Sequence, residues 1–325
     1  MLESYKTHVE ERAKQNIPPL PLDADQTSQL VELLKSEHTE SELLLYLFKE
    51  RTPAGVDQAA YVKAAFLADI TVGNASSPYI NKVTAVELLG TMLGGYNIQP
   101  LIKCLKDDEL ASAAVNTLSK TLLIFDAFNE VFELSKTNTY AKEVIDNWAN
   151  AKWFTDKPNL PEKIKLTVFK VSGEINTDDL SPAPDAWSRP DIPLHALAMF
   201  KMPRSGLSDP LETIDKLKEK GNPLVFVGDV VGTGSSRKSA TNSVLWHMGD
   251  EIPCIPNKKE GGFCFGGKIA PIFFNTLEDS GPFPIEMDGS KMIMGQAIFL
   301  EPFNGKVIDA NTSEVLSEFS LKTDV

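Results

Sequence analysis

The chain has 325 residues, of which 42% are hydrophobic and 24% charged, and a formal net charge of −13 at pH 7. These values are typical of a globular protein with about two domains, each large enough for its own core. The acidic charge argues against broad non-specific binding to nucleic acid or to an anionic membrane surface. Because no apolar run approaches about 18 residues and the N-terminus lacks a signal-peptide pattern, we expect a cytoplasmic protein.

The first half of the chain has the spacing of apolar residues that is typical of helices. Helices are predicted at residues 26–35, 43–48, 58–70, 85–92, 99–105, 109–119, 122–134 and 140–150. Capping boxes at 39–42 and 84–87, and an N-cap at Asp57, mark three of the starts. Short helices with brief turns predict a HEAT-like array over residues 1–157, although an irregular helical bundle remains the alternative because no clean repeat is present.

A proline-marked junction at residues 157–163 separates this half from a region with the alternation and β-branched content of strands. Strands are predicted at residues 165–171, 223–227 and 269–274, and type I′ hairpins at Asp288-Gly289 and Asn304-Gly305. Residues 158–325 are therefore expected to form a mixed α/β domain.

Polar residues follow the first predicted strand. Thr177, Asp178, Asp179 and Ser181 lie in one short run, and Arg189 comes soon after it. These hydroxyls and carboxylates could bind a polar substrate. An arginine can bind a substrate carboxylate through two parallel hydrogen bonds. The simpler alternative is an Asx turn that caps a helix, with Arg189 as a surface charge.

A glycine-rich turn follows the second predicted strand and precedes a segment that can form a helix. Gly232 and Gly234 are followed by Ser235, Ser236 and Arg237. Backbone N–H groups at the start of a helix suit an anion. The turn matches neither a Walker phosphate loop, nor a dinucleotide fingerprint, nor a G-x-S-x-G nucleophile elbow. A tight turn with a serine that caps the helix is the simpler alternative.

The cysteines and two of the histidines are predicted to be structural. Cys104, Cys254 and Cys264 include no pair with Cys-x-x-Cys spacing, so we expect small buried hydrophobes and no zinc or iron–sulfur site. His195 and His247 lie in apolar surroundings, where a packed imidazole is commoner than a catalytic one.

Both loops carry a family resemblance. The segment from Thr177 to Ala183 resembles T-[DT]-x-[IL]-S-x-A, and Gly234-Ser-Ser-Arg237 resembles the G-S-S-R loop, of the aconitase swivelling domain. Residues 187–198 and 266–275 are similar as well, and a helical domain before the swivelling domain is the arrangement of the bacterial B type. The resemblance implies a lyase of the tricarboxylic acid cycle that interconverts citrate and isocitrate through cis-aconitate, and that also acts on 2-methyl-cis-aconitate.

The resemblance also implies roles for the loop residues. Ser235 would be the catalytic base that takes the substrate's proton. Asp178 would act in the hydrogen-bond network around the hydroxyl that leaves or arrives. The substrate-binding residues that the resemblance implies are Arg189, Ser235, Ser236, Arg237, Thr177 and Ser181.

Aconitases use a [4Fe–4S] cluster, whose open iron binds the substrate. None of the three cysteines falls in a ligand motif of the family. We therefore expect the N-terminal part of a longer enzyme, which binds no cluster, does not turn over citrate alone, and relies on downstream aconitase domains.

Two other functions stay open. A helical array can be a binding module, for which the partners would be a second copy in a homodimer or messenger RNA in the apo form. The acidic charge weighs against RNA. The second alternative is a protein like the small subunit of isopropylmalate dehydratase, against which the helical half of the chain weighs.

Overall fold

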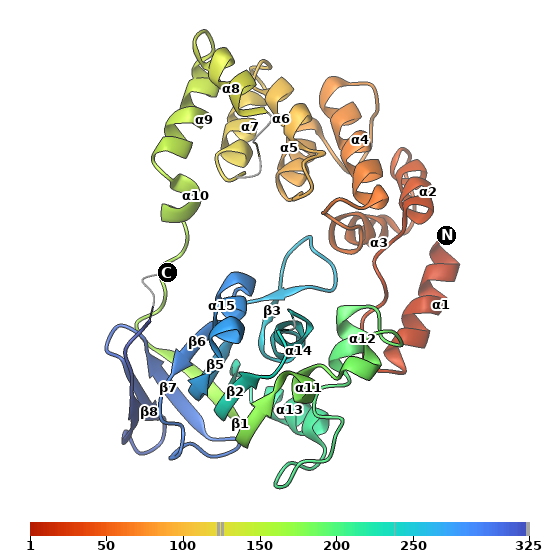
Figure 1. The fold of residues 1–325 in the computed structure, drawn as a ribbon. Coiled ribbons are helices and arrows are strands. Elements are labelled where there is room, and N and C mark those ends of the chain that lie inside the picture. The colour runs from red at the N-terminus through yellow and green to blue at the C-terminus, as the bar shows by residue number, and fades with distance from the viewer. Residues whose placement is uncertain (122–123, 125–126, 237, 323–325) are drawn as a thin grey trace. The chain divides into compact units, whose positions relative to one another are not determined.

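The computed structural model describes residues 1–121, 124, 127–236 and 238–322 (Figure 1). Its contacts divide the chain into two compact units. The first comprises Met1–Asn159 with Pro253–Pro256, and the second comprises Leu160–Ile252 with Asn257–Val325. Within the described ranges, no helix combines the length and the apolar character needed to cross a membrane.

The first unit is built from helices. They are α1 (Leu2–Ala13), α2 (Ala24–Leu34), α3 (Ser41–Tyr46), the π-helical η1 (Leu47–Arg51), α4 (Gln58–Val72), α5 (Lys82–Gly90), α6 (Ile98–Cys104), α7 (Ala111–Leu118), α8 (Phe128–Ser135), α9 (Thr139–Ala149) and α10 (Lys152–Thr155). Neighbours in the chain pack on one another, as α4 does on α2 and α5, and α9 on α7 and α8. Each predicted helix is present with shifted ends, whereas α1 and α10 were not predicted. Residues 122–123 and 125–126 of the predicted helix at 122–134 lie outside the described residues.

Both predicted capping boxes are wrong. Helix α5 begins after Asn81, whose side chain accepts a hydrogen bond of 2.8 Å from the backbone N–H of Thr84. Asparagine is as good an N-cap as threonine, so the helix begins at the earlier cap. Helix α3 begins after Glu40, which makes no side-chain cap bond.

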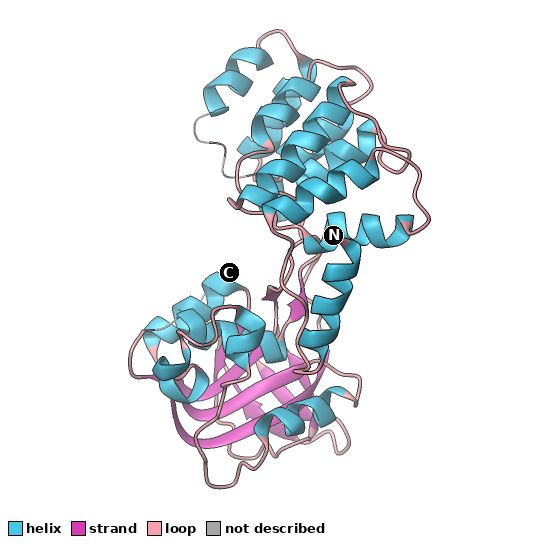
Figure 2. Ribbon diagram, turned by 90° about the vertical axis from the view of Figure 1, so that its right-hand side faces the viewer, coloured by secondary structure: helices cyan, strands magenta, loops and turns pink. Residues whose placement is uncertain are grey.

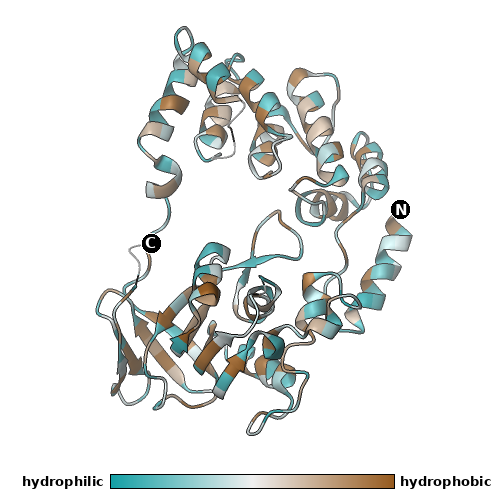
Figure 3. Cartoon of the chain, in the orientation of Figure 1, coloured by the Kyte–Doolittle hydropathy of each residue, from teal (hydrophilic) through white to brown (hydrophobic). Residues whose placement is uncertain are grey.

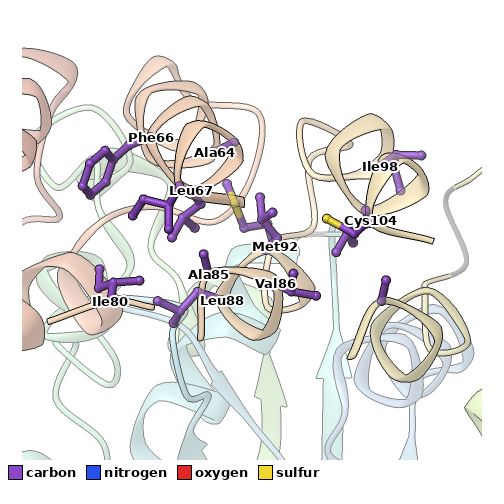
Figure 4. Packing of buried hydrophobic residues seen from close by; sticks show 14 of the residues in the cluster. Ala64, Phe66, Leu67, Ile80, Ala85, Val86, Leu88, Met92, Ile98 and Cys104 are labelled. Atoms are coloured by element: carbon purple, nitrogen blue, oxygen red, sulfur yellow. The ribbon is translucent and has the colours of Figure 1, made fainter. Parts of the chain in front are cut away.

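The helices bury one continuous apolar cluster (Figure 4). Leu67 from α4 lies close to Ala85 and Leu88 from α5, and Met92 follows from the end of the same helix. Residues three and four apart share one face of a helix, so these positions all point into the core. Hydropathy along the ribbon shows the same alternation of faces (Figure 3).

A lysine lies inside this helical core. Lys63 of α4 has no exposed surface, and its Nζ donates to the backbone carbonyl of Lys49 at 3.2 Å. The ammonium also lies 5.5 Å from the centre of the Phe48 ring. Burial lowers the pKa of Lys63 to about 8, although the nearby Cys254 and Glu50 act in the opposite direction.

This burial predicts a pH-dependent stability. Between pH 8 and the ordinary lysine pKa of 10.5, the unfolded chain holds a proton that the folded chain has lost. The contribution of Lys63 to the free energy of unfolding should therefore rise with pH across this window, by up to about 3 kcal/mol. We expect Lys63→Met to remove this rise in urea unfolding at pH 7 and pH 10, whereas the exposed Lys103→Met should keep it. An equal rise in the Lys63 variant would contradict the assignment.

The second unit is a mixed α/β fold (Figure 2). Its strands are β1 (Ile164–Asn176), β2 (Leu224–Thr233), β3 (Asp250–Glu251), β4 (Lys259–Glu260), β5 (Phe263–Ile269), β6 (Phe283–Glu286), β7 (Ala297–Glu301), β8 (Lys306–Asp309) and β9 (Val315–Glu318). Its helices are α11 (Thr177–Leu180), the 3-10 helix η3 (Ala183–Asp185), α12 (Ile192–Ala196), α13 (Pro210–Lys218), α14 (Lys238–Met248) and α15 (Pro271–Ser280). The large sheet has the order β6-β5-β2-β1-β7-β8-β9, in which the first four strands are parallel and the others antiparallel.

Each face of the sheet has its own core. Phe169 of β1 and Phe226 of β2 lie in a cluster with residues of α13, α14 and α15. Their neighbours Val168 and Val225 lie in a second cluster on the opposite face. Side chains alternate between faces along a strand, so the stretches Val168–Phe169 of β1 and Leu224–Val227 of β2 are continuously apolar because both faces are covered there.

The later strands correct three predictions. Only Ile269 of the predicted strand 269–274 is in a strand, because Pro271 opens α15, and proline suits the first turn of a helix. No strand follows Asp288-Gly289 in residues 291–294, so that hairpin is wrong. The second hairpin is present, since β7 pairs with β8, but its loop spans the four residues between Glu301 and Lys306. Gly305 has a positive φ and Asn304 does not, so the predicted type I′ turn is wrong.

Candidate functional site

The two polar loops begin at the carboxyl ends of β1 and β2, on the same side of the sheet. Strands β1 and β2 are parallel neighbours, and Asn176 at the end of one is in register with Thr233 at the end of the other. Strand β5 runs parallel on the other side of β2 and ends at Ile269. In open α/β sheets, ligands bind beyond the carboxyl ends of parallel strands. Residues that are far apart in the sequence thus meet where a ligand site is expected.

Glycines shape the second loop. Gly232 and Gly234 have φ angles of +80° and +90°, in the left-handed region that favours glycine. A Cβ atom on Gly232 would lie 2.2 Å from Cγ of Phe273, a residue of α15. The loop therefore passes close against α15 because it has no side chain there.

Thr177 ties the two loops together. Its Oγ1 donates a hydrogen bond of 2.8 Å to the backbone carbonyl of Ser235. Thr177 is only 1% exposed, whereas Ser235 and Ser236 are exposed. The contact holds the backbone of Ser235 while its hydroxyl lies at the surface. The predicted substrate-binding residue Arg237 lies outside the described residues.

Ser181 is buried in a chain of three polar side chains. Its Oγ lies 2.7 Å from Nε2 of His195 and 2.6 Å from Oγ of Ser239. Burial lowers the pKa of His195, so the imidazole is neutral near pH 7. Sequence reasoning missed Ser239 and treated His195 as structural. The signal for both was their position beside the two motifs that carry the resemblance.

The two neighbouring aspartates have different environments. Asp178 is exposed, and its Oδ1 accepts a bond of 3.4 Å from the N–H of Ala183. Asp179 caps α11 through Asn176 and pairs with Arg204 at 3.2 Å. Asp179 is therefore held within the protein, while Asp178 lies at the surface near the loop. Nothing in the sequence motif pointed to Arg204.

Arg189 is braced by its own segment. Its Nε lies 3.3 Å from Oδ1 of Asp185, and its Nη1 donates to the carbonyl of Leu194 at 3.1 Å. Asp185 is buried and also accepts a bond of 2.8 Å from Nζ of Lys201. The hydrogen bond from Lys201, together with Arg189, lowers the pKa of Asp185, so this carboxylate stays charged and orients the guanidinium.

A small pocket of about 110 Å³ opens between the two polar loops and the start of α15. It is lined by Thr177, Gly232, Gly234, Ser236, Ala270, Pro271, Ile272, Phe273 and Thr276. Among the predicted site residues, Thr177 and Ser236 thus share one cavity. Ser235, Asp178, Ser181 and Arg189 do not line it.

The cysteines do not fit an iron–sulfur cluster. Cys104 is buried in the helical unit, and Cys264 is fully buried in β5, where burial raises its pKa to about 12. Cys254 is buried too, and burial raises its pKa. Cluster ligands are thiolates held together around the metal. No group of three or more His, Cys, Asp or Glu side chains in the described part of the chain could hold a metal ion.

Comparisons with known proteins match almost the whole chain. Residues 4–154 match the family model "Aconitate B N-terminal domain", and residues 166–325 match "Aconitate hydratase 2 N-terminus". The chain is 59% identical to aconitate hydratase B of Pseudomonas aeruginosa and of Escherichia coli, and 47% identical to that of Helicobacter pylori.

These alignments cover 99–100% of the chain, but the chain spans only 38–39% of the length of these relatives. A solved 3-isopropylmalate dehydratase structure from Methanocaldococcus jannaschii is 19% identical, with a TM-score of 0.36, and covers 49% of this chain and 83% of that one.

Proposed function

The chain belongs to the aconitate hydratase B family, and from this premise we propose that it supplies the proton-abstracting and carboxylate-binding residues of a tricarboxylate hydro-lyase. The reaction is the interconversion of citrate and isocitrate through cis-aconitate in the tricarboxylic acid cycle, with 2-methyl-cis-aconitate as a second substrate. The observation that carries the proposal is the bond from Thr177 to the carbonyl of Ser235, which joins the two motifs at one sheet edge.

The exposed hydroxyl of Ser235 is the base in this proposal. Removal of a proton next to a carboxylate needs a strong base, and an alkoxide is one if positive charge stabilises it. Arg237 supplies that charge and, with Ser236 and Arg189, binds the carboxylates of the substrate. Asp178 at the surface completes the hydrogen-bond network around the substrate hydroxyl, with Thr177 and Ser181 behind it.

Loss of the hydroxyl needs a Lewis acid, which a [4Fe–4S] cluster supplies in the proposed whole enzyme. The three cysteines of this chain do not fit such a cluster, so we assign its ligands to the remaining length of the protein. The chain alone is then expected not to turn over citrate.

We further propose the domain identities that the family implies. Residues 1–157 form a HEAT-like helical domain, and residues 158–325 form the swivelling domain. The partners are a tricarboxylate and the other domains of the full-length enzyme. The enzyme is favoured over a binding module, because no observation in the described residues supports a homodimer or messenger RNA as a partner.

Arg189 provides a direct test. In the full-length enzyme, Arg189→Lys should raise KM for isocitrate about tenfold with a smaller change in kcat, since a charge-assisted bidentate contact contributes about 1.5–3 kcal/mol. The formation of cis-aconitate is followed by its ultraviolet absorbance. Lys216→Met is the control, because Lys216 is exposed and forms an ion pair with Glu212 on α13. Wild-type protein that forms no cis-aconitate would overturn the proposed function.

A further inference from the structure

Resting on the proposed function, we propose that His195 is a positioning residue that fixes Arg189 relative to the Ser235–Ser236 loop. It acts through Ser181 and Ser239. The imidazole itself does not touch the substrate. Its role is to hold the segment that carries Arg189 in place relative to the loop that carries Ser235 and Ser236.

The first link is the chain of hydroxyls. His195 lies on α12 and reaches Ser181, which directly follows α11. Ser181 in turn reaches Ser239 in the first turn of α14, two residues after Arg237. At 2.7 and 2.6 Å, both contacts are short hydrogen bonds. One buried ring therefore joins the turn of the first motif to the helix that follows the second.

The second link is through the helix of His195 itself. The carbonyl of Leu194, the preceding residue, accepts the Nη1 bond of Arg189. Asp191 caps the same helix by accepting from the N–H of Leu194 at 3.3 Å. A shift of α12 relative to α14 would therefore move the Arg189 guanidinium relative to the serine loop. Residues that bind a carboxylate in bidentate fashion tolerate little displacement.

The tautomer of the His195 ring decides which group donates in each hydrogen bond of the His195–Ser181–Ser239 series. A neutral imidazole has one N–H donor and one acceptor nitrogen. Backbone groups of Asp185 and Arg189 interact with the ring, and our proposal includes the tautomer in which Nδ1 carries the N–H and Nε2 faces Ser181 as an acceptor. In the proposed arrangement, Ser181 donates to Nε2 of His195 and Ser239 donates to Ser181, which fixes the orientation of both hydroxyls.

A second histidine offers a matched control. His247 of α14 bonds through Nε2 to the carbonyl of Ala196 at 3.0 Å, so it also joins α14 to α12. It is buried like His195, and burial lowers its pKa to about 4. It lies near the far end of α14, and no described contact links it to the hydroxyl chain. Its loss should weaken the packing at the far end of α14, while the contact of Ser181 with Ser239 keeps the first turn of α14 in place relative to α12.

The kinetic test uses the full-length, cluster-loaded enzyme. We expect His195→Leu and Ser239→Ala each to raise KM for isocitrate about tenfold, the effect of about 1.4 kcal/mol, with a smaller change in kcat. His195→Gln, which can still bond to Ser181, should restore most of the affinity. His247→Leu should lower Tm as much as His195→Leu does while KM stays close to that of the wild type. Equal changes in KM for the two histidine variants, or no change for Ser239→Ala, would overturn the proposal.

A second readout does not need activity. In the 325-residue chain, the ¹⁵N shifts of the His195 ring should show an acceptor Nε2, and both Ser181→Ala and Ser239→Ala should shift that signal. An unmoved signal in Ser239→Ala would overturn the linkage. Absence of turnover by the wild-type enzyme would count against the proposed function alone, since the spectra still decide whether His195 holds the two elements.

Discussion

Replacing Ser235 by alanine in the full-length enzyme is expected to lower kcat for isocitrate by about 10³-fold, because a positioned acid–base group contributes about 10²–10⁴ to the rate. The hydroxyl of Ser235 is exposed at the sheet edge, while its backbone is held by Thr177. Alanine removes the base and leaves that backbone contact intact. The fold of the loop should therefore survive, and the effect should appear mainly in kcat.

Two other serines make this result specific. Ser236→Ala should act mainly on KM, because that hydroxyl lines the pocket and is proposed to bind a carboxylate. Ser208, which is exposed elsewhere in the α/β unit, should be replaceable by alanine without effect. Equal kcat values for Ser235→Ala and the wild type would remove Ser235 from the role of base. The rates are measured as cis-aconitate formation, with circular dichroism as the check on folding.

The second large effect is expected at Gly232. An alanine there must adopt φ near +80° and place its Cβ 2.2 Å from Cγ of Phe273. The left-handed conformation costs about 1–2 kcal/mol and overpacking about 1–3 kcal/mol. We therefore expect Gly232→Ala to lower the free energy of unfolding by about 2–5 kcal/mol, measured by urea unfolding of the 325-residue chain.

Gly206 separates the two contributions. Its φ is +77°, and nothing lies within 4 Å of an added Cβ, so Gly206→Ala should pay only the conformational cost. A Phe273→Gly background removes both the ring and the Cβ atom of Phe273, which would lie 2.4 Å from the added Cβ. In that background the cost of Gly232→Ala should fall toward that of Gly206→Ala, which a double-mutant cycle measures. Identical costs at Gly206 and Gly232 in the otherwise wild-type chain would show that the contact with Phe273 does not constrain the loop.

Local signals in the sequence located the main elements. Apolar spacing predicted the helices from α2 to α9, alternation predicted β1, and a short apolar run predicted the start of β2. Their ends were less certain, because several polar residues near a helix start compete as caps, and Asn81 prevailed over Thr84. The strand predicted at 269–274 failed because six apolar or small residues fit a buried strand and a buried helix equally well.

For the candidate site too, the sequence determined one part and the tertiary structure the other. The amino-acid sequence by itself determined the two motifs, the glycines that their loop needs, and the family, because these depend on residue types at short spacing. Only the tertiary structure decided which of these residues meet. Pairing of β1 with β2 brings Thr177 to Ser235 across 58 positions. The packing of the segment that follows β1 brings Asp179 to Arg204 and His195 to Ser181. Those contacts depend on the order of strands in the sheet and on helix packing, which no local spacing encodes.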